Sequence, residues 1–151
     1  MDDIVISLKD LSVYQNDILI LSGVNVSLKR GTFTYLIGKT GSGKSSLLRL
    51  LYLDLPFKSG EAIVAGYNIG KIKRREIPYL RRKIGIVFQD FQLLHDRNVY
   101  DNLKFVLRAT GWNDKEKIKL KIEEVLNAVN LSTKGFKMPH QLSGGEQQRV
   151  G

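Results

Sequence analysis

The chain has no cysteine, three prolines and a single tryptophan among its 151 residues. Without cysteine, neither a disulfide framework nor a Cys-based zinc site can form, and this composition suits the cytosol. No apolar run reaches the length of a membrane span, because Gly, Lys or Asp interrupts the longest ones. The start, Met1-Asp2-Asp3, is acidic where a secretory signal needs positive charge. We therefore expect a cytoplasmic globular protein.

Acidic residues are also scarce, with 15 Asp and Glu against 24 Lys and Arg, for a net charge of +9. A basic excess suits nucleic acid, an anionic membrane face or phosphorylated ligands, and by itself does not choose among them. The densest stretch is 71–83, with seven basic residues and one acid. Its simplest interpretation is a solvated face, and contact with nucleic acid or lipid headgroups is the alternative.

A glycine-rich stretch organises the rest of the chain. Residues 38–45 read GKTGSGKS and fit the pattern G-x-x-x-x-G-K-[ST] of a phosphate-binding loop. The preceding segment 32–37 predicts a buried strand, and leucines at helical spacing predict a helix over 44–53. A strand, a glycine loop and a helix start aim backbone N–H groups at one point, where an anion binds.

The pattern assigns roles within this loop. The ammonium of Lys44 is expected to contact the β- and γ-phosphates, and the hydroxyl of Ser45 to bind Mg²⁺. The candidate phosphate-binding residues are Gly38, Lys39, Thr40, Gly41, Ser42, Gly43, Lys44, Ser45 and Ser46.

The remaining pattern alternates strands and helices. Before the loop, we expect two short strands over 4–8 and 11–14, a turn at 15–17, and a strand over 18–28. After the loop, strands are expected at 62–65 and 84–88, with a turn at 66–68. A helix is expected over about 75–83, with Pro78 in its first turn. Two further helices are expected over 99–110 and 115–130, capped by Asn98 and Asp114. This order predicts an α/β domain with a mainly parallel core sheet, an antiparallel β edge and a helical subdomain.

Three further sites have two interpretations each. Tyr14 is either a core aromatic of the hairpin or a stacking surface for a base. Gln89, at the end of strand 84–88, is either an ordinary loop residue or a ligand for Mg²⁺ or water. Ser143 with Glu146 forms a capping box, and the two glycines between them leave N–H groups that suit a second anion site.

Taken together, the motifs resemble those of ATP-binding cassette ATPases. Residues 38–45 resemble the Walker A motif, and LSGGEQ resembles the signature motif. Ser143 of the second motif follows Lys44 of the first by 99 residues, a distance that suits this family. The resemblance implies ATP and Mg²⁺ as ligands, an adenine stacked on Tyr14, and Gln89 as the Q-loop glutamine. It also implies a head-to-tail homodimer in which the signature of one subunit covers the γ-phosphate held by the other. The signature residues are Leu142, Ser143, Gly144, Gly145, Glu146 and Gln147.

Residues 75–102, with REIPYLRR, FQD and DRNVYDN, are similar to the FtsE family of cell-division ATPases. That resemblance implies a membrane partner of the FtsX type, docked near residues 89–107, and a peripheral place on the inner face of the plasma membrane. ATPases of lipoprotein-release and macrolide exporters are the first alternative. A DNA-handling cassette ATPase is a weaker one, because there is no coiled-coil or zinc insertion, and we expect no nucleic-acid partner. A non-catalytic binding module is the third alternative.

The sequence departs from the family pattern in one major respect. It contains no apolar strand ending in Asp-Glu (Walker B) and no switch histidine after the signature. The resemblance implies that the Walker B glutamate and the switch histidine lie beyond Gly151. We therefore expect a partial domain with no catalytic residues of its own, a β-rich core over 1–90 and a helical part over about 91–151.

The intact protein is expected to hydrolyse ATP, and this chain alone to be inactive. Two minor departures from the family pattern are Thr32, where glutamate is usual, and Lys39. Neither changes the expectation of phosphate binding.

Overall fold

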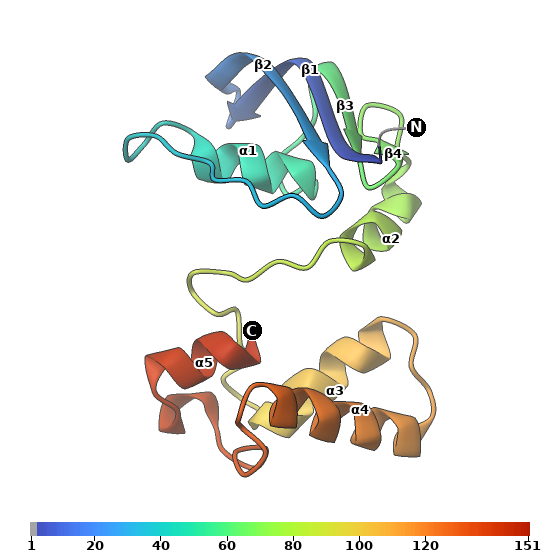
Figure 1. Cartoon of the computed structure of the whole chain (residues 1–151), viewed down its shortest axis with the longest axis vertical. Coiled ribbons are helices and arrows are strands. Elements are labelled where there is room, and N and C mark those ends of the chain that lie inside the picture. The colour runs from blue at the N-terminus through green and yellow to red at the C-terminus, as the bar shows by residue number, and fades with distance from the viewer. Residues whose placement is uncertain (1–2) are drawn as a thin grey trace. The chain divides into compact units, whose positions relative to one another are not determined.

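The computed structural model describes residues 3–151, which divide into two compact units at Gly85 and Ile86. The first unit contains a four-stranded sheet of order β2-β1-β3-β4 (Figure 1). Its strands are β1 (Ile4–Gln15), β2 (Ile18–Lys29), β3 (Ser59–Val64) and β4 (Tyr67–Asn68). All three pairings are antiparallel. Asn16 and Asp17 both have positive φ and form the tight β1–β2 turn, as predicted there.

The first strand is continuous, whereas the sequence pattern predicts two short strands over 4–8 and 11–14. Its pairing shifts register between Leu8 and Leu11, and Asp10 there has a φ of 48°. Such a bulge adds one residue, so that Leu8 and Leu11, three apart, both face the core together with Val13. The predicted break between two strands is therefore wrong, because Asp10 in this gap forms a bulge within one strand.

One helix, α1 (Lys44–Leu51), lies against a face of this sheet (Figure 1). Its buried Leu47 and Leu50 belong to the same core as Leu11 and Val13. The helix ends at Leu51, two residues before the predicted end. Its end is tied down by Arg81, whose guanidinium donates hydrogen bonds to the carbonyls of residues 52 and 53.

The basic stretch folds as a short turn and helix. The 3₁₀ turn η1 (Arg74–Glu76) leads into α2 (Ile77–Arg82), with Pro78 in the first turn as predicted. Leu80 is fully buried in the core of the first unit. The segment 66–68, predicted as a turn, contains the short edge strand β4, which pairs with β3 at two positions.

The two strands expected for a parallel core are not formed within residues 3–151. Segments 32–37 and 84–88 belong to no strand of the described structure, and most of the first is exposed, with Phe33 at 82% and Ile37 at 88% exposed. A parallel strand exists only where neighbours accept its backbone hydrogen bonds, and the described sheet offers none to these segments. The predictions of a buried strand here are therefore wrong for the described structure.

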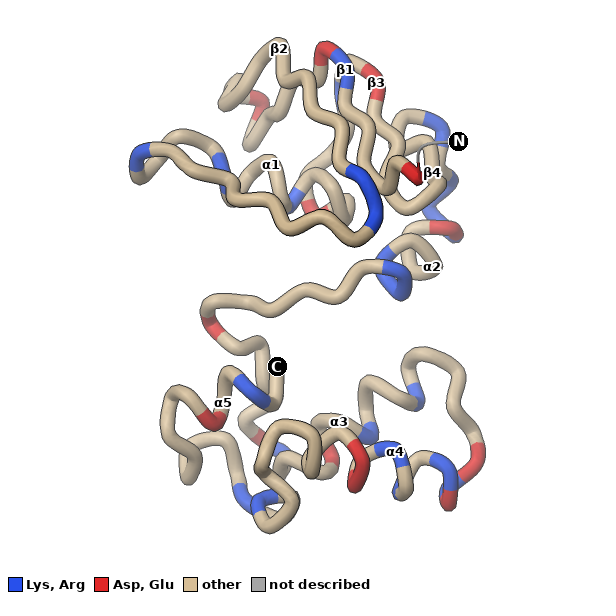
Figure 2. Tube along the Cα trace, in the orientation of Figure 1, with Lys and Arg blue, Asp and Glu red and all other residues tan. Residues whose placement is uncertain are grey.

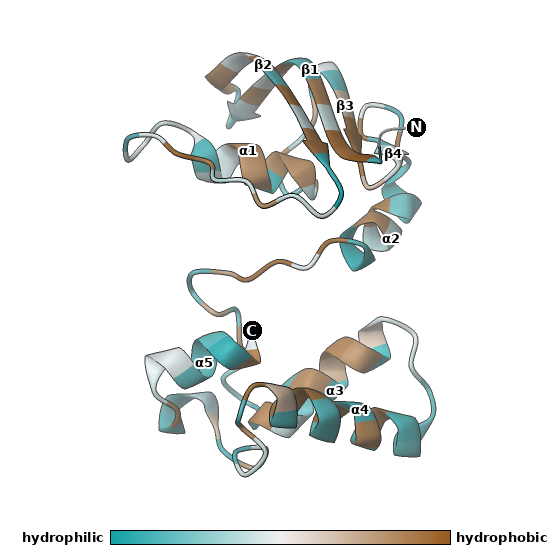
Figure 3. Cartoon of the chain, viewed as in Figure 1, coloured by the Kyte–Doolittle hydropathy of each residue, from teal (hydrophilic) through white to brown (hydrophobic). Residues whose placement is uncertain are grey.

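The second unit is helical: α3 (Val99–Ala109), α4 (Lys115–Ala128), the 3₁₀ turn η2 (Pro139–Gln141) and α5 (Gly144–Val150). Asn98 and Asp114 accept hydrogen bonds from the first-turn N–H groups of α3 and α4, which confirms both predicted caps. Ile118, Ile122 and Leu126 form the buried stripe of α4, and polar residues form its outer face (Figure 3).

A buried asparagine organises the loop before α3. Asn102 is only 7% exposed. Its Oδ1 accepts from the N–H of Leu94 at 2.8 Å, and its Nδ2 donates to the carbonyls of Leu94, Arg97 and Asn98 at 2.9–3.2 Å. A buried amide is stable only when its donors and acceptor are satisfied, and this one is satisfied by the loop it holds.

Candidate functional site

The glycine loop ends at the start of α1, where backbone N–H groups have no side-chain cap. The N-cap residue is Gly43, with φ 85° and ψ 6°, and Gly41 has φ 80°. Both angles lie in the left-handed region that glycine adopts without steric cost. Because the first N–H groups of a helix lack internal partners, this uncapped end presents donors to an anion.

The ammonium of Lys44 lies within the loop. It donates to the carbonyls of Gly38 at 2.8 Å and Lys39 at 2.7 Å, and lies 3.4 Å from the hydroxyl of Ser42. The loop is also tight at Gly38, where an added Cβ would lie 2.8 Å from that hydroxyl. The lysine therefore holds its own charge beside the uncapped helix end, in the position where phosphate oxygens would need a counterion.

Gly43 also fixes the loop against the sheet. A Cβ at this position would lie 2.8 Å from Cγ2 of Ile20 and 2.9 Å from Cγ of Leu21, both on β2. The backbone of the loop thus packs directly on a strand, and the left-handed φ at the same residue adds a second reason for glycine. The sequence pattern predicts the glycine but not the strand that it packs against.

Two serines follow Lys44 in the first turn of α1. Ser45 is exposed, and its hydroxyl has no hydrogen-bond partner among the described residues. The hydroxyl of Ser46 donates to Oε1 of Gln15 at 3.3 Å, which links the end of β1 to the start of α1. A hydroxyl without a partner beside a phosphate-binding loop fits a role as a Mg²⁺ ligand. Nothing in the sequence pattern singles out Gln15.

Tyr14 is half-buried near the end of the same strand, one residue before Gln15. The ammonium of Lys58 lies 5.0 Å from the centroid of its ring, a cation–π distance. Lys58 also forms an ion pair with Asp17, and this hydrogen bond and charge lower the pKa of Asp17 below its ordinary value. The sequence pattern did not predict that Lys58 lies beside the candidate base-stacking ring of Tyr14, because the two residues are 44 positions apart in the chain.

The other candidate residues belong to the second unit. Gln89 is exposed and lies in a turn after segment 84–88, which forms no strand. The structure does not place it at the end of a strand, contrary to the prediction. Leu142 is buried in the core of its unit, whereas Ser143, Gly144 and Gly145 are exposed at the start of α5.

The predicted capping box is confirmed at this helix start. The hydroxyl of Ser143 accepts from the N–H of Glu146 at 3.3 Å, and Oε2 of Glu146 accepts from the N–H of Ser143 at 2.8 Å. Lys134 forms an ion pair with Glu146 at 3.2 Å. The exposed glycines are thereby held on a fixed turn of helix. Lys134 is a support for the motif that the local pattern did not predict.

Gly151 lies at the C-terminal end of α5, where it follows Val150. Its N–H donates to the carbonyl of Gln147 at 3.2 Å, which continues the hydrogen bonding of the helix by one residue. A Cβ added to Gly151 would lie 2.8 Å from the carbonyl oxygen of Phe91, so the end of α5 packs closely on the loop before α3. The location of a Walker B glutamate and a switch histidine beyond Gly151 stays a prediction.

Glu146 should make the start of α5 sensitive to acid. The hydrogen bond from the Ser143 backbone, followed by that from Lys134, lowers the pKa of Glu146 below its ordinary value of 4.5. A lowered pKa stabilises the folded form above the ordinary value, and this contribution is lost as the pH falls through the lowered one. We expect NMR titration to show faster exchange of the Ser143 amide in that range. The variant Lys134→Met should raise the pKa of Glu146. The matched control Lys121→Met should leave that pKa unchanged. An unchanged Glu146 titration in both variants would contradict the role given to Lys134.

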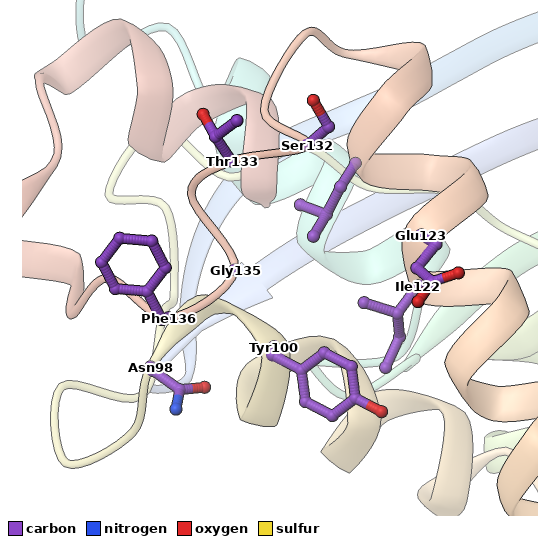
Figure 4. Close-up of a pocket in the computed structure, with 9 residues that line it drawn as sticks. Asn98, Tyr100, Ile122, Glu123, Ser132, Thr133, Gly135 and Phe136 are labelled. Carbon is purple, nitrogen blue, oxygen red and sulfur yellow. The ribbon is translucent and has the colours of Figure 1, made fainter.

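A hollow of about 690 Å³ in the helical unit lies away from the signature residues. It opens between the start of α3, the middle of α4 and the loop 132–136 (Figure 4). Tyr100, Ile122 and Phe136 give it an apolar wall, and Asn98 and Glu123 add polar atoms. Its lining includes none of the candidate site residues. Within residues 3–151, no cluster of His, Asp or Glu suits a metal ion, and no helix is long and apolar enough to cross a membrane.

Comparison with known families and proteins agrees with this geometry. Residues 21–151 match the family described as ABC transporter. The chain is 42% identical over 147 residues to the cell division ATP-binding protein FtsE of Streptococcus pneumoniae serotype 2, covering 97% of this chain and 64% of that protein. It is 44% identical over 148 residues to the methionine import ATP-binding protein MetN of Helicobacter pylori, covering 97% and 45%. The chain thus spans less than two thirds of the length of these relatives.

Solved structures show the same fold. CbiO1 of Clostridium perfringens, part of the ABC transporter complex cbiONQ, has a TM-score of 0.84 and 30% identity, covering 99% of this chain and 59% of that one. The dimeric structure of MJ0796, described as a bacterial ABC transporter cassette, also has a TM-score of 0.84, with 31% identity, covering 96% and 66%. The expected class of fold, a cassette-type nucleotide-binding domain, is confirmed.

Proposed function

The chain belongs to the ABC transporter family, and from that premise we propose that the intact protein is the ATP-binding and ATP-hydrolysing subunit of a membrane complex. The observation that carries the proposal is the uncapped start of α1 with the ammonium of Lys44 beside it. This arrangement supplies backbone donors, a helix dipole and a cation to one triphosphate tail.

The candidate residues described above have the following roles in this proposal. The amides of residues 41–45 bind the β- and γ-phosphates, and Lys44 exchanges its loop carbonyls for phosphate oxygens. Tyr14 stacks on the adenine from the end of β1, where Gln15 ties the strand to α1. When bound, Mg²⁺ neutralises phosphate charge; Ser45 is the residue here that fits it best, and Gln89 is the second proposed ligand.

The signature residues complete the site of a second subunit in the proposal. Ser143, Gly144 and Gly145 are exposed on a capped helix start, which suits contact with a γ-phosphate from outside the chain. The solved MJ0796 cassette is described as dimeric, and a related structure of it as bound to ADP and Pi. We propose that this protein forms a homodimer too, with its two subunits arranged head to tail. We also propose that residues 1–151 alone bind ATP without turnover, since their sequence has no apolar strand ending in Asp-Glu.

A calorimetric titration with ATP and Mg²⁺ tests the proposal directly. We expect saturable binding of ATP, much weaker binding of AMP, and no turnover by this chain. AMP has the base but lacks the β- and γ-phosphates that the loop is proposed to hold, so equal affinities would contradict the assignment. The absence of any saturable binding would exclude it.

For the biological role, we propose cell division with a membrane partner of the FtsX type, at the inner face of the plasma membrane. The proposal rests on the DRNVYDN string before and within α3 and on the similarity to FtsE proteins. The similarity to MetN, named as a methionine import protein, is comparable and makes an importer ATPase the second candidate. Co-purification of the intact protein with its membrane subunit separates the two, because the identity of that subunit differs.

Arg97 is the proposed contact for the membrane partner. Its guanidinium lies 5.0 Å from the centroid of Phe105, and it lines a hollow of about 460 Å³ with Phe105 and Lys104. We expect Arg97→Glu to weaken binding of the membrane subunit by about tenfold or more, because it replaces a cation with an anion beside Asp96 and Asp101. The affinity for ATP should be unchanged.

Pull-down of the membrane subunit together with an ATP titration measures both affinities. Lys119→Glu is the matched control, since it reverses an exposed charge on α4 outside this hollow. An equal loss of partner binding and ATP binding in Arg97→Glu would contradict the proposal that Arg97 contacts the membrane partner.

A further inference from the structure

Most of the charge excess of this chain is gathered around α2. The stretch 71–83 has seven basic residues and one acid, so that it contributes +6 of the net charge of +9. One of the seven, Arg81, is used inside the fold, where it binds two carbonyls at the end of α1. The other six form what we call the α2 basic surface, and all are exposed: Lys71, Lys73, Arg74, Arg75, Arg82 and Lys83.

This surface has little internal compensation. The carboxylate of the single acid, Glu76, accepts a hydrogen bond from the backbone N–H of Lys73 at 2.8 Å and so caps η1. No ion pair found among residues 3–151 includes Lys71, Lys73, Arg74 or Arg75. Figure 2 shows the basic segments on both sides of the one acidic segment before α2. The four side chains at its start are therefore available to external anions.

Aromatic rings accompany the remaining cations. The guanidinium of Arg82 lies 5.3 Å from the ring centroid of Tyr79, and the ammonium of Lys83 lies 5.0 Å from that of Tyr67. Tyr79 is 57% exposed. A tyrosine has an apolar ring and a polar tip, and tyrosines with lysines and arginines are the residues enriched at membrane–water interfaces.

We propose that the α2 basic surface binds the anionic phospholipid headgroups of the membrane at which this protein works. Four to eight clustered cations are the usual number in segments that recognise anionic lipids, and six lie here within 13 residues. Duplex nucleic acid fits less well, because α2 has six residues and spans only about 9 Å, too short to follow a groove. The inference rests on the proposed membrane function and adds a direct lipid contact to it.

Vesicle co-sedimentation of the 151-residue chain tests the inference. Vesicles of phosphatidylcholine with about one third phosphatidylglycerol should bind the chain, and pure phosphatidylcholine should not. The triple variant Lys73→Gln, Arg74→Gln, Arg75→Gln should bind the anionic vesicles about 100-fold more weakly, since each cation near such a surface contributes a factor of about five. The matched control is Lys115→Gln, Lys117→Gln, Lys119→Gln, which removes three exposed charges on α4.

Three results would overturn the inference: no preference for anionic vesicles, an equal loss in both triple variants, or tighter, steeply salt-dependent binding to a DNA duplex than to vesicles. Titration of the same variants with ATP separates this inference from the proposed function. Loss of vesicle binding with retained ATP binding in the α2 variant is the expected result. Failure of the wild-type chain to bind ATP would instead exclude the proposed function.

Discussion

Replacing Lys44 with alanine is expected to weaken ATP binding by at least about 100-fold. A hydrogen bond to a charged group is worth about 1.5–3 kcal/mol, and this ammonium is placed to serve two phosphates. The variant should also lose most of its preference for ATP over AMP, because the lost contacts involve only the β- and γ-phosphates. Isothermal titration with each nucleotide measures both effects.

The matched control for this change is Lys39→Ala. Lys39 carries the same charge in the same loop, and it offers its backbone carbonyl, not its side chain, to Lys44. We expect it to lower ATP affinity only a few-fold, as removal of a nearby exposed charge does. Similar losses in both variants would mean that the loop attracts ATP by its overall charge and that Lys44 has no specific role.

Asn102→Ala is expected to lower the free energy of unfolding of the helical unit by about 2–4 kcal/mol. The substitution removes the acceptor for the N–H of Leu94 and the donor for the carbonyls of Leu94, Arg97 and Asn98. The loop before α3 loses the side chain that holds it, while its partly buried backbone groups lose their partners. Thermal unfolding and amide exchange of Leu94 report the change.

Asn127→Ala provides the control, because Asn127 is exposed on α4 and no side-chain hydrogen bond is found for it within residues 3–151. It should change stability by less than about 0.5 kcal/mol. An Asn102→Ala variant as stable as this control would show that water replaces the amide without cost, and that the loop does not depend on it.

The sequence predicted correctly the features that depend on interactions between residues close together in the chain. The caps Asn98, Asp114 and Ser143, and the first-turn position of Pro78, all involve hydrogen bonds or steric limits within one turn of helix. The glycine loop was recognisable for the same reason, since its conformation depends on residues that carry no Cβ. The hairpin turn at 16–17 also required only two residues with positive φ.

Predictions that depended on a distant partner were less successful. Segments 32–37 and 84–88 have the composition of buried strands, but a strand is completed by its neighbours, and the described sheet has none for them. The contacts of Lys58 with Tyr14 and of Gln15 with Ser46 join residues 44 and 31 positions apart, which no local pattern encodes. The bulge at Asp10 was not predicted, because a register shift is defined by the pairing with β2 and not by residues 4–14 alone.

The unpaired segment 32–37, TFTYLI, has a further consequence for handling the protein. It has no charge and no proline, and its aromatic pair Phe33 and Tyr35 packs edge to face in the open, with ring centroids 4.8 Å apart. Six uncharged residues of high β propensity that belong to no sheet within residues 3–151 are the type of segment from which cross-β aggregates grow. Lys29 and Arg30 on one side and Lys39 on the other act as gatekeepers, so the colloidal stability of concentrated solutions should depend on these flanking charges remaining unscreened.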